Sequence, residues 1–241
     1  MLPSLIERPI LFAHRGARAH ARENTLEAFA LAGRLGADGI ETDAWMTRDG
    51  IVVLDHDGVV RRGFRRTPMS DVDRRDLPEF IPSLLELLDT LTPDTHLSID
   101  VKDSSAADAI VSACDATGHR RDRLWLCHPD VELVARWRRF DGVRLVNSTR
   151  LDRLADGAER RCSLLARDGI DVLNMPQQDW SGGLTTLAHR FGILAFAWDA
   201  QQEHRIDELL RMGIDGVYGD HVDRLVEARH KQPERPPTTG L

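Results

Sequence analysis

The chain has 241 residues, with 32 basic and 39 acidic side chains and a formal net charge of −7. Its length suits one large domain, and an apolar content of 41% is ordinary for a soluble globular protein. The acidic balance gives no reason to expect nucleic-acid binding, and no stretch approaches the ~20 apolar residues of a membrane span.

Short apolar runs alternate with amphipathic stretches, which is the pattern of βα units around a parallel sheet. The apolar runs predict strands at residues 10–13, 39–43, 96–101, 124–127, 144–147, 172–175, 192–198 and 216–218. The amphipathic stretches predict helices near residues 25–35, 83–91, 106–117, 131–140, 159–168, 184–190, 203–212 and 222–230. This alternation closes naturally as a single-domain TIM (β/α)8 barrel. An open doubly wound sheet is the alternative, but the Gly-rich fingerprint it would need is absent after the first strand.

Polar side chains stand at the ends of several predicted strands, where barrels of this kind carry their active sites. His14 follows the first strand, and Glu41 and Asp43 lie in the second. Side chains two apart in a strand share a face, so Glu41 and Asp43 point the same way. Two adjacent carboxylates in an apolar strand repel one another and cost desolvation unless a cation sits between them.

Later positions extend this pattern. Asp100 and Lys102 end the third predicted strand, and His56 lies on the loop after a short extended piece, residues 51–54. Asp100 adds a third hard oxygen ligand to the two carboxylates of the second strand. Such a set favours Mg²⁺ or Ca²⁺ over zinc, with salt bridges to barrel arginines as the alternative. His14 and His56 complete a cluster suited to acid–base chemistry beside a metal.

Short motifs follow one another along the chain. The first are His14-Arg15-Gly16, Glu23-Asn24-Thr25, Glu41-x-Asp43, Thr47-x-Asp49-Gly50 and His56-Asp57. The later ones are Ile81-Pro82-Ser83-Leu84, Asp100-x-Lys102, Ala197-Trp198-Asp199 and Gly213-x-Asp215-Gly216-x-x-Gly219-Asp220. Each motif alone is weak, but in this order and spacing they resemble the glycerophosphodiester phosphodiesterase family. The resemblance covers about residues 10–225.

The resemblance implies a metal-dependent enzyme that hydrolyses glycerophosphodiesters to sn-glycerol 3-phosphate and an alcohol. It implies an acid–base pair, His14 and His56, and a divalent metal, Mg²⁺ or Ca²⁺, held by Glu41, Asp43 and Asp100. In the family the neighbouring glycerol hydroxyl is the nucleophile, and it gives a cyclic phosphate that water then opens.

The resemblance also places two cations and an aromatic ring against the substrate. Arg15 and Lys102 would face the phosphate, since Arg can bind two oxygens in a fork while Lys acts as a point charge. Lys102 is one of two lysines among the 32 basic residues, so a Lys at this strand end suggests a role that Arg does not fill. Trp198 would form an apolar wall against the glycerol carbons, with core packing as the alternative.

The sequence departs from the family pattern at Asp100, where the family usually has Glu. Aspartate is one methylene shorter, so either the metal lies closer to this strand or a water intervenes. Mg²⁺ keeps its waters, whereas Ca²⁺ accepts longer and more flexible ligand distances, so a bridging water would favour Mg²⁺. The choice between the two ions stays open at this point.

Two other functions fit the same fold. A related lipid-cleaving phospholipase would want a signal peptide, disulfides or an apolar rim, and the sequence shows none of these. A catalytically silent binding barrel should have lost one of the histidines or carboxylates, and all are present. The alcohol head group of the small-molecule substrate and the oligomeric state also stay open.

The expected boundaries are a barrel over residues 1–230, a short loop insertion near 58–80 and a disordered, proline-containing tail over 231–241. Asn24-x-x-Glu27 matches a capping box and predicts that Asn24 begins a helix. Asn24 and Thr25 would then serve the helix start rather than the site.

The three cysteines, Cys114, Cys127 and Cys162, are widely spaced and form no CxxC. This spacing argues against a disulfide framework and indicates free thiols in a reducing compartment. Residues 1–12 lack the basic start and long apolar run of a signal peptide. We therefore expect a cytoplasmic protein without stable membrane insertion.

Overall fold

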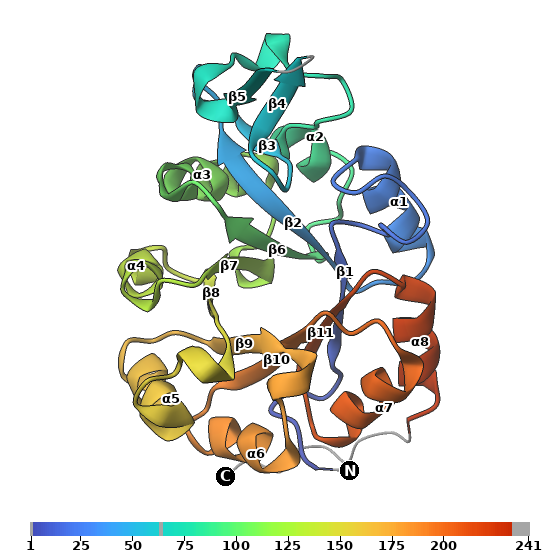
Figure 1. The fold of residues 1–241 in the computed structure, drawn as a ribbon, viewed down its shortest axis with the longest axis vertical. Coiled ribbons are helices and arrows are strands. Elements are labelled where there is room, and N and C mark those ends of the chain that lie inside the picture. The colour runs from blue at the N-terminus through green and yellow to red at the C-terminus, as the bar shows by residue number, and fades with distance from the viewer. Residues whose placement is uncertain (1, 63–64, 233–241) are drawn as a thin grey trace.

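Parallel strands form a closed barrel in the computed structural model, which describes residues 2–62 and 65–232 (Figure 1). In order around the barrel the strands are β1 (Ile10–His14), β2 (Gly39–Met46), β6 (His96–Val101), β7 (Leu124–His128), β8 (Arg144–Ser148), β9 (Val172–Pro176), β10 (Leu194–Trp198) and β11 (Gly216–Gly219). β1 pairs with both β2 and β11, with Phe12 opposite Gly39 and Ile10 opposite Gly216. The strands thus close on themselves, and the predicted TIM barrel is confirmed.

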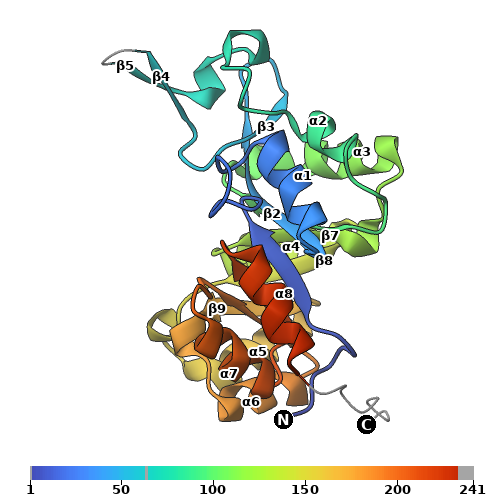
Figure 2. The same cartoon turned by 90° about the vertical axis from the view of Figure 1, so that its right-hand side faces the viewer.

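Helices surround the barrel and cover the outer faces of its strands (Figures 1 and 2). They are α1 (Leu26–Arg34), α2 (Leu84–Leu88), α3 (Ala107–Thr117), α4 (Val131–Arg136), α5 (Gly157–Arg167), α6 (Gly182–Arg190), α7 (Glu203–Arg211) and α8 (Val222–His230). Outward strand residues such as Leu97 and Leu126 belong to one large apolar cluster with helix residues such as Ile110. The alternation of β and α elements predicted from the sequence is therefore the observed one.

Differences from the predicted elements are confined to their ends. The helix expected over residues 131–140 stops at Arg136, and Trp137–Arg139 continue it as a 3-10 turn. The strand expected from Gly192 begins only at Leu194, because Gly192 has a φ of 72° and forms the turn before the strand.

Aromatic rings fill the barrel interior. Phe12 stacks on Tyr218 with ring centroids 4.6 Å apart, and Trp125 and Phe196 lie 5.2 Å apart beside them. All four rings belong to one buried cluster. The barrel is thus a packed core, and one cavity lies above these rings, at the C-terminal ends of the strands.

The segment near 58–80 is more than the loop expected from the sequence. β3 (Val52–Leu54) pairs antiparallel with the far part of β2, and a separate hairpin follows, β4 (Val59–Arg62) and β5 (Arg65–Pro68). Two short 3-10 turns, Met69–Asp71 and Arg74–Asp76, lead back towards α2. The hairpin projects away from the barrel (Figure 2). Its base packs through a small apolar cluster that includes Val60, Met69 and Val53 of β3.

The C-terminal boundary of the barrel falls at the end of α8. Lys231 follows this helix and forms ion pairs with Glu203 and Glu227. Of the tail expected to be disordered, residues 233–241 lie outside the described residues. Within the described part, no helix is long and apolar enough to cross a membrane.

Candidate active site

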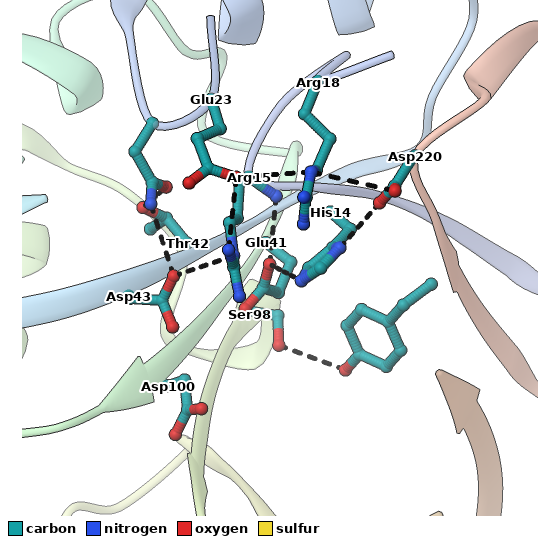
Figure 3. A network of polar contacts seen from close by, with 12 residues as sticks. His14, Arg15, Arg18, Glu23, Glu41, Thr42, Asp43, Ser98, Asp100 and Asp220 are labelled. Atoms are coloured by element: carbon teal, nitrogen blue, oxygen red, sulfur yellow. Dashed lines mark hydrogen bonds and ion pairs between the residues drawn. The ribbon is translucent and has the colours of Figure 1, made fainter. Parts of the chain in front are cut away.

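The strand register brings the predicted site residues side by side. His14 on β1 lies opposite Glu41 on β2, and Asp43 lies opposite Asp100 on β6. All four stand towards the C-terminal ends of neighbouring parallel strands, so their side chains converge on one edge of the barrel (Figure 3).

His14 is held from both sides by carboxylates. Its Nδ1 lies 2.7 Å from Asp220 Oδ1, and its Nε2 lies 3.8 Å from Glu41 Oε2. Burial lowers the pKa of His14, but the Glu41 charge and the hydrogen bond to Asp220 more than offset this, and the pKa lies above its ordinary value. Burial alone would raise the pKa of Asp220, but the hydrogen bond with His14 brings it below the ordinary value. This arrangement fixes the ring and directs Nε2 towards the carboxylates of the site.

The three predicted metal ligands form a repulsive group of carboxylates. Burial raises the pKa of Glu41 to about 7, and the charges of Asp43 and Asp100 act in the same direction, whereas His14 opposes them. Glu41 and Asp43 are only 9% and 2% exposed. Buried carboxylates that repel one another are stabilised by a cation between them, and their oxygens suit Mg²⁺ or Ca²⁺. The donor set therefore fits the divalent metal that the sequence predicts.

Two cationic side chains lie among these carboxylates. Arg15 donates its backbone N–H to Glu41 Oε2 at 3.0 Å, and its Nε lies 3.2 Å from Asp43 Oδ2. Lys102 Nζ lies 3.2 Å from Asp43 Oδ1 and also donates to Asp100 Oδ2. The salt bridges considered as an alternative role for the carboxylates are thus present. These ion pairs also hold Arg15 and Lys102 at the strand ends.

The Arg15-Gly16 pair forms a tight turn directly after β1. Arg15 has a φ of 53° and Gly16 a φ of 77°, so the chain turns through the left-handed region twice in succession. A Cβ at Gly16 would lie 2.7 Å from the backbone carbon of Ala28 in α1, so glycine permits the close approach. The strained Arg15 backbone in turn aims its N–H at Glu41.

Asn24 is a site residue that the sequence reasoning placed wrongly. The N-cap of α1 is Thr25, whose hydroxyl accepts from the backbone N–H of Ala28, so Asn24 does not cap the helix. Asn24 instead has a φ of 53°, donates to Asp43 Oδ2 at 3.3 Å and accepts from Thr42 at 2.8 Å. The sequence around Asn24 is also typical of a helix cap, because Asn is favoured at caps as well as in left-handed turns. The pattern therefore did not indicate the contact with Asp43.

These side chains line one cavity of about 430 Å³. Its lining contains seven of the predicted residues, which are His14, Arg15, Glu41, Asp43, Asp100, Lys102 and Trp198. Cys127, Ser148, Asn174, Asp199 and Tyr218 complete it. Burial raises the pKa of the Cys127 thiol, so this cysteine is not a poised nucleophile.

Trp198 lines the cavity and carries a buried N–H without a hydrogen-bond partner in the described part of the chain. Among the described residues, Trp198 Nε1 and Asn174 Oδ1 are buried polar atoms without a hydrogen-bond partner. Both residues line the cavity, and the guanidinium of Arg150 lies 4.8 Å from the centre of the Trp198 ring. Buried polar atoms are normally paired, so these two residues of the lining are candidates for contact with a ligand.

His56 is the one predicted site residue that does not line the cavity. It is exposed on the loop after β3, and its Nδ1 lies 3.0 Å from Asp57 Oδ1. The loop is held by Asp55, whose Oδ2 accepts the backbone N–H groups of Asp57 and Gly58 at 2.9 Å each. Burial raises the pKa of Asp55, and the charge of Asp43 contributes in the same direction, so the His56 loop begins beside the carboxylate group.

Asp220 is a further residue of the candidate site that the sequence alone did not single out. It follows β11, and 206 positions separate it from His14. The signal available was its place directly after a strand, which is the same signal that singled out His14. The terminal motif containing Asp220 contributed only to the family resemblance.

The closed barrel and the polar cavity at the C-terminal ends of its strands are those of a TIM-barrel enzyme. The family model described as the glycerophosphoryl diester phosphodiesterase family matches residues 14–224, and the chain belongs to this family. The resemblance drawn from the motifs is thereby confirmed.

Individual relatives agree over nearly their whole lengths. A Mycobacterium tuberculosis protein, "Probable glycerophosphodiester phosphodiesterase 2", is 27% identical over 90% of this chain and 89% of its own. The crystal structure of a Thermotoga maritima glycerophosphodiester phosphodiesterase shares 26% identity and a TM-score of 0.78, covering 92% of this chain and 99% of that one. An Oleispira antarctica phosphodiesterase, solved with the product sn-glycerol-3-phosphate, shares the fold at 20% identity and a TM-score of 0.78, covering 93% and 98%.

Proposed function

We propose that the protein hydrolyses glycerophosphodiesters to sn-glycerol 3-phosphate and an alcohol at the cavity above the barrel, with a divalent cation held by Glu41, Asp43 and Asp100. The observation that carries this proposal is the register of β1, β2 and β6, which groups a histidine, the three carboxylates and two cations in one cavity. Membership of the family supports the reaction class. The Oleispira antarctica phosphodiesterase with bound product supports the choice of substrate.

A phosphate diester brings negative charge that the cavity can balance. When bound, the cation would supply Lewis-acid stabilisation of the phosphoryl oxygens. Arg15 and Lys102 already stand among the carboxylates, and they stabilise the charge that develops on the same oxygens. Trp198 lies against the glycerol carbons and offers its free Nε1–H to a hydroxyl group.

Proton transfer is assigned to the two histidines. The glycerol hydroxyl next to the phosphate attacks phosphorus while one histidine accepts its proton, and the other histidine protonates the departing alcohol oxygen. A cyclic phosphate results, and water opens it to sn-glycerol 3-phosphate. Asp220 keeps Nδ1 of His14 engaged, so Nε2 is the nitrogen that moves the proton. His56 is the second histidine, on the exposed loop after β3.

We infer that Mg²⁺ is the preferred ion. Asp100 has the shorter side chain, and Lys102 already holds one of its oxygens, so Asp100 would be the weakest of the three ligands. Mg²⁺ dehydrates reluctantly and is commonly held by one or two carboxylates, whereas Ca²⁺ takes more direct oxygen ligands. The three buried free thiols fit the reducing cytoplasm expected for the protein.

Release of sn-glycerol 3-phosphate from choline, ethanolamine, glycerol and inositol esters tests the proposal. Treatment with EDTA should abolish turnover, and added Mg²⁺ should restore it better than Ca²⁺. Asp43→Asn should prevent restoration by either ion, whereas Asp108→Asn, at an exposed position in α3, should behave as wild type. Full turnover by the metal-free protein, or no turnover of any ester by the Mg²⁺-loaded protein, would refute the assignment.

A further inference from the structure

Two histidines and an aspartate come together outside the cavity, where the loop after β1 meets the start of α8. In the described part of the chain, one ligand atom from each of His20, His221 and Asp223 lies within 4.8 Å of the others. His20 Nε2 is 3.2 Å from Asp223 Oδ1, and the two imidazole rings stand edge to face with centroids 5.9 Å apart. We propose that these three side chains form a second metal site, for a transition-metal ion such as Zn²⁺.

The spacing of the three ligand atoms suits one ion. Zinc binds histidine nitrogen and carboxylate oxygen at about 2.0–2.2 Å, so neighbouring ligand atoms in a tetrahedral site stand roughly 3.4 Å apart. The contact between His20 and Asp223 is already close to this value, and all three ligand atoms lie within 4.8 Å of one another. Two imidazoles with one carboxylate favour zinc and its transition-metal neighbours, in contrast to the all-oxygen set inside the cavity.

The backbone holds the two segments in place without the metal. Ala19 N–H donates to the carbonyl of Asp220 at 3.4 Å, which ties the loop after β1 to the end of β11. His20 N–H in turn donates to Ala17 at 2.9 Å. A site whose backbone is fixed in this way loses little conformational entropy when the ion binds.

The other uses of these side chains are weak. His221 occupies the N-cap position of α8, yet its side chain makes no capping hydrogen bond. The exposed ion pair between His20 and Asp223 contributes little to stability, because water screens it. The positive end of α8 opposes a cation only weakly at this exposed position. These side chains are therefore available to coordinate an ion.

The site lies beside the catalytic machinery without sharing a residue with it. His221 directly follows Asp220, which positions His14, and Arg18 on the same loop pairs with both Glu23 and Asp220. An ion bound by His20 and His221 would therefore fasten together the two segments that flank the His14–Asp220 pair.

Calorimetric titration of the full chain with Zn²⁺, in the presence of excess Mg²⁺ to fill the cavity site, tests the proposal. Wild type should bind one Zn²⁺ in the micromolar range or tighter. His20→Ala and His221→Ala should each weaken this binding at least tenfold. His204→Ala, which removes an exposed imidazole from α7, is the matched control and should leave it unchanged.

A second readout identifies the ligands directly. Co²⁺ in place of Zn²⁺ should give the visible absorption of a low-coordinate site with nitrogen ligands in wild type, and His20→Ala should diminish it. Circular dichroism checks that the variants are folded, as expected for substitutions at the surface. The proposal is overturned if wild type binds no Zn²⁺ under these conditions, or if both histidine variants bind it as tightly as wild type.

Discussion

Asp220 shows how one carboxylate can decide the role of a histidine. It accepts from Nδ1 of His14 across the seam between β1 and β11, at 2.7 Å, and so leaves Nε2 directed towards Glu41. His56 has a comparable neighbour in Asp57, at 3.0 Å, but in an exposed loop. The two histidines of the proposed pair thus differ in environment, one half-buried at the barrel rim and one exposed on a loop.

Replacement of either histidine should reduce catalysis without unfolding the protein. We expect His14→Ala and His56→Ala each to lower kcat by roughly 10²–10⁴-fold, the range for loss of a general acid or base. Asp220→Asn should cause a smaller loss, because the ring stays in place but loses its anionic partner. Steady-state kinetics with saturating metal measures all three.

The control for these variants is His204→Ala, whose imidazole is exposed on α7 and is not part of the cavity lining. It should retain wild-type kcat. A folded His56→Ala protein with near-normal kcat would show that the exposed loop histidine has been given the wrong role, and the same outcome for His14 would remove the acid–base assignment.

At the scale of the elements, the strands were predictable because an apolar run bounded by turn residues is a local signal. That Glu41 and Asp43 share a face follows from the two-residue period of β2 alone. Their alignment with Asp100 does not, because a shift of register by one residue would turn the side chains to opposite faces. The structure was needed to identify two further residues. Asp220 is distant from His14 along the chain, and Asn24 occupies a position that a helix cap would also explain.

The start of β6 carries a histidine with a structural rather than a catalytic role. Burial lowers the pKa of His96 to about 4, and the charge of Arg123 adds to this effect. Trp125 Nε1–H donates to His96 Nδ1 at 3.0 Å. The neutral ring is therefore part of the folded barrel, at the end opposite the cavity.

This histidine should make stability depend on pH in a defined window. Well above pH 6.5 the His96 ring is neutral in both the folded and the unfolded protein, so it contributes no pH dependence to stability. Between about pH 6.5 and 4, His96 is protonated in the unfolded chain but stays neutral in the folded protein. The free energy of unfolding should therefore fall by roughly 3 kcal/mol as the pH is lowered through this range. Urea unfolding at pH 7 and pH 4.5 measures this difference for wild type and for His96→Gln.

The Gln variant should lose most of this pH dependence, while His204→Gln, at an exposed position, should keep it. Comparison of the two variants cancels the contribution of the other titrating groups. An unchanged pH dependence in His96→Gln would mean that the ring is protonated in the folded protein.

Over the whole molecule, the two ends of the barrel have different tasks. The C-terminal ends of the strands hold the cavity, whereas the opposite end carries two carboxylates that join the first and last parts of the chain. Asp38 accepts from the backbone N–H of Leu11 at 2.9 Å and pairs with Arg229 of α8. Asp215 binds the N-terminal segment in a similar way. In barrels of this class the N-terminal face serves stability and the C-terminal face serves chemistry.

Asp215 is the sharpest test of this division. Its side chain is fully buried and accepts four hydrogen bonds, from Ser4 Oγ at 2.6 Å, Leu5 N–H at 2.9 Å, Ala195 N–H at 2.7 Å and His189 Nε2 at 2.7 Å. Asp215→Ala leaves these donors without their acceptor. We expect it to lower the free energy of unfolding by about 3–5 kcal/mol, measured by urea denaturation, as for other buried pairs that lose one partner.

Asp108→Ala is the matched control, because Asp108 is exposed and its ion pair with Arg139 lies at the surface. That variant should lose at most about 1 kcal/mol. At a temperature where Asp215→Ala is folded, its kcat should equal that of wild type, because Asp215 lies at the end of the barrel away from the cavity. A loss of stability no larger than that of Asp108→Ala would show that the N-terminal segment is not fastened through this carboxylate. A large fall in kcat in the folded variant would instead show that the two faces of the barrel are coupled.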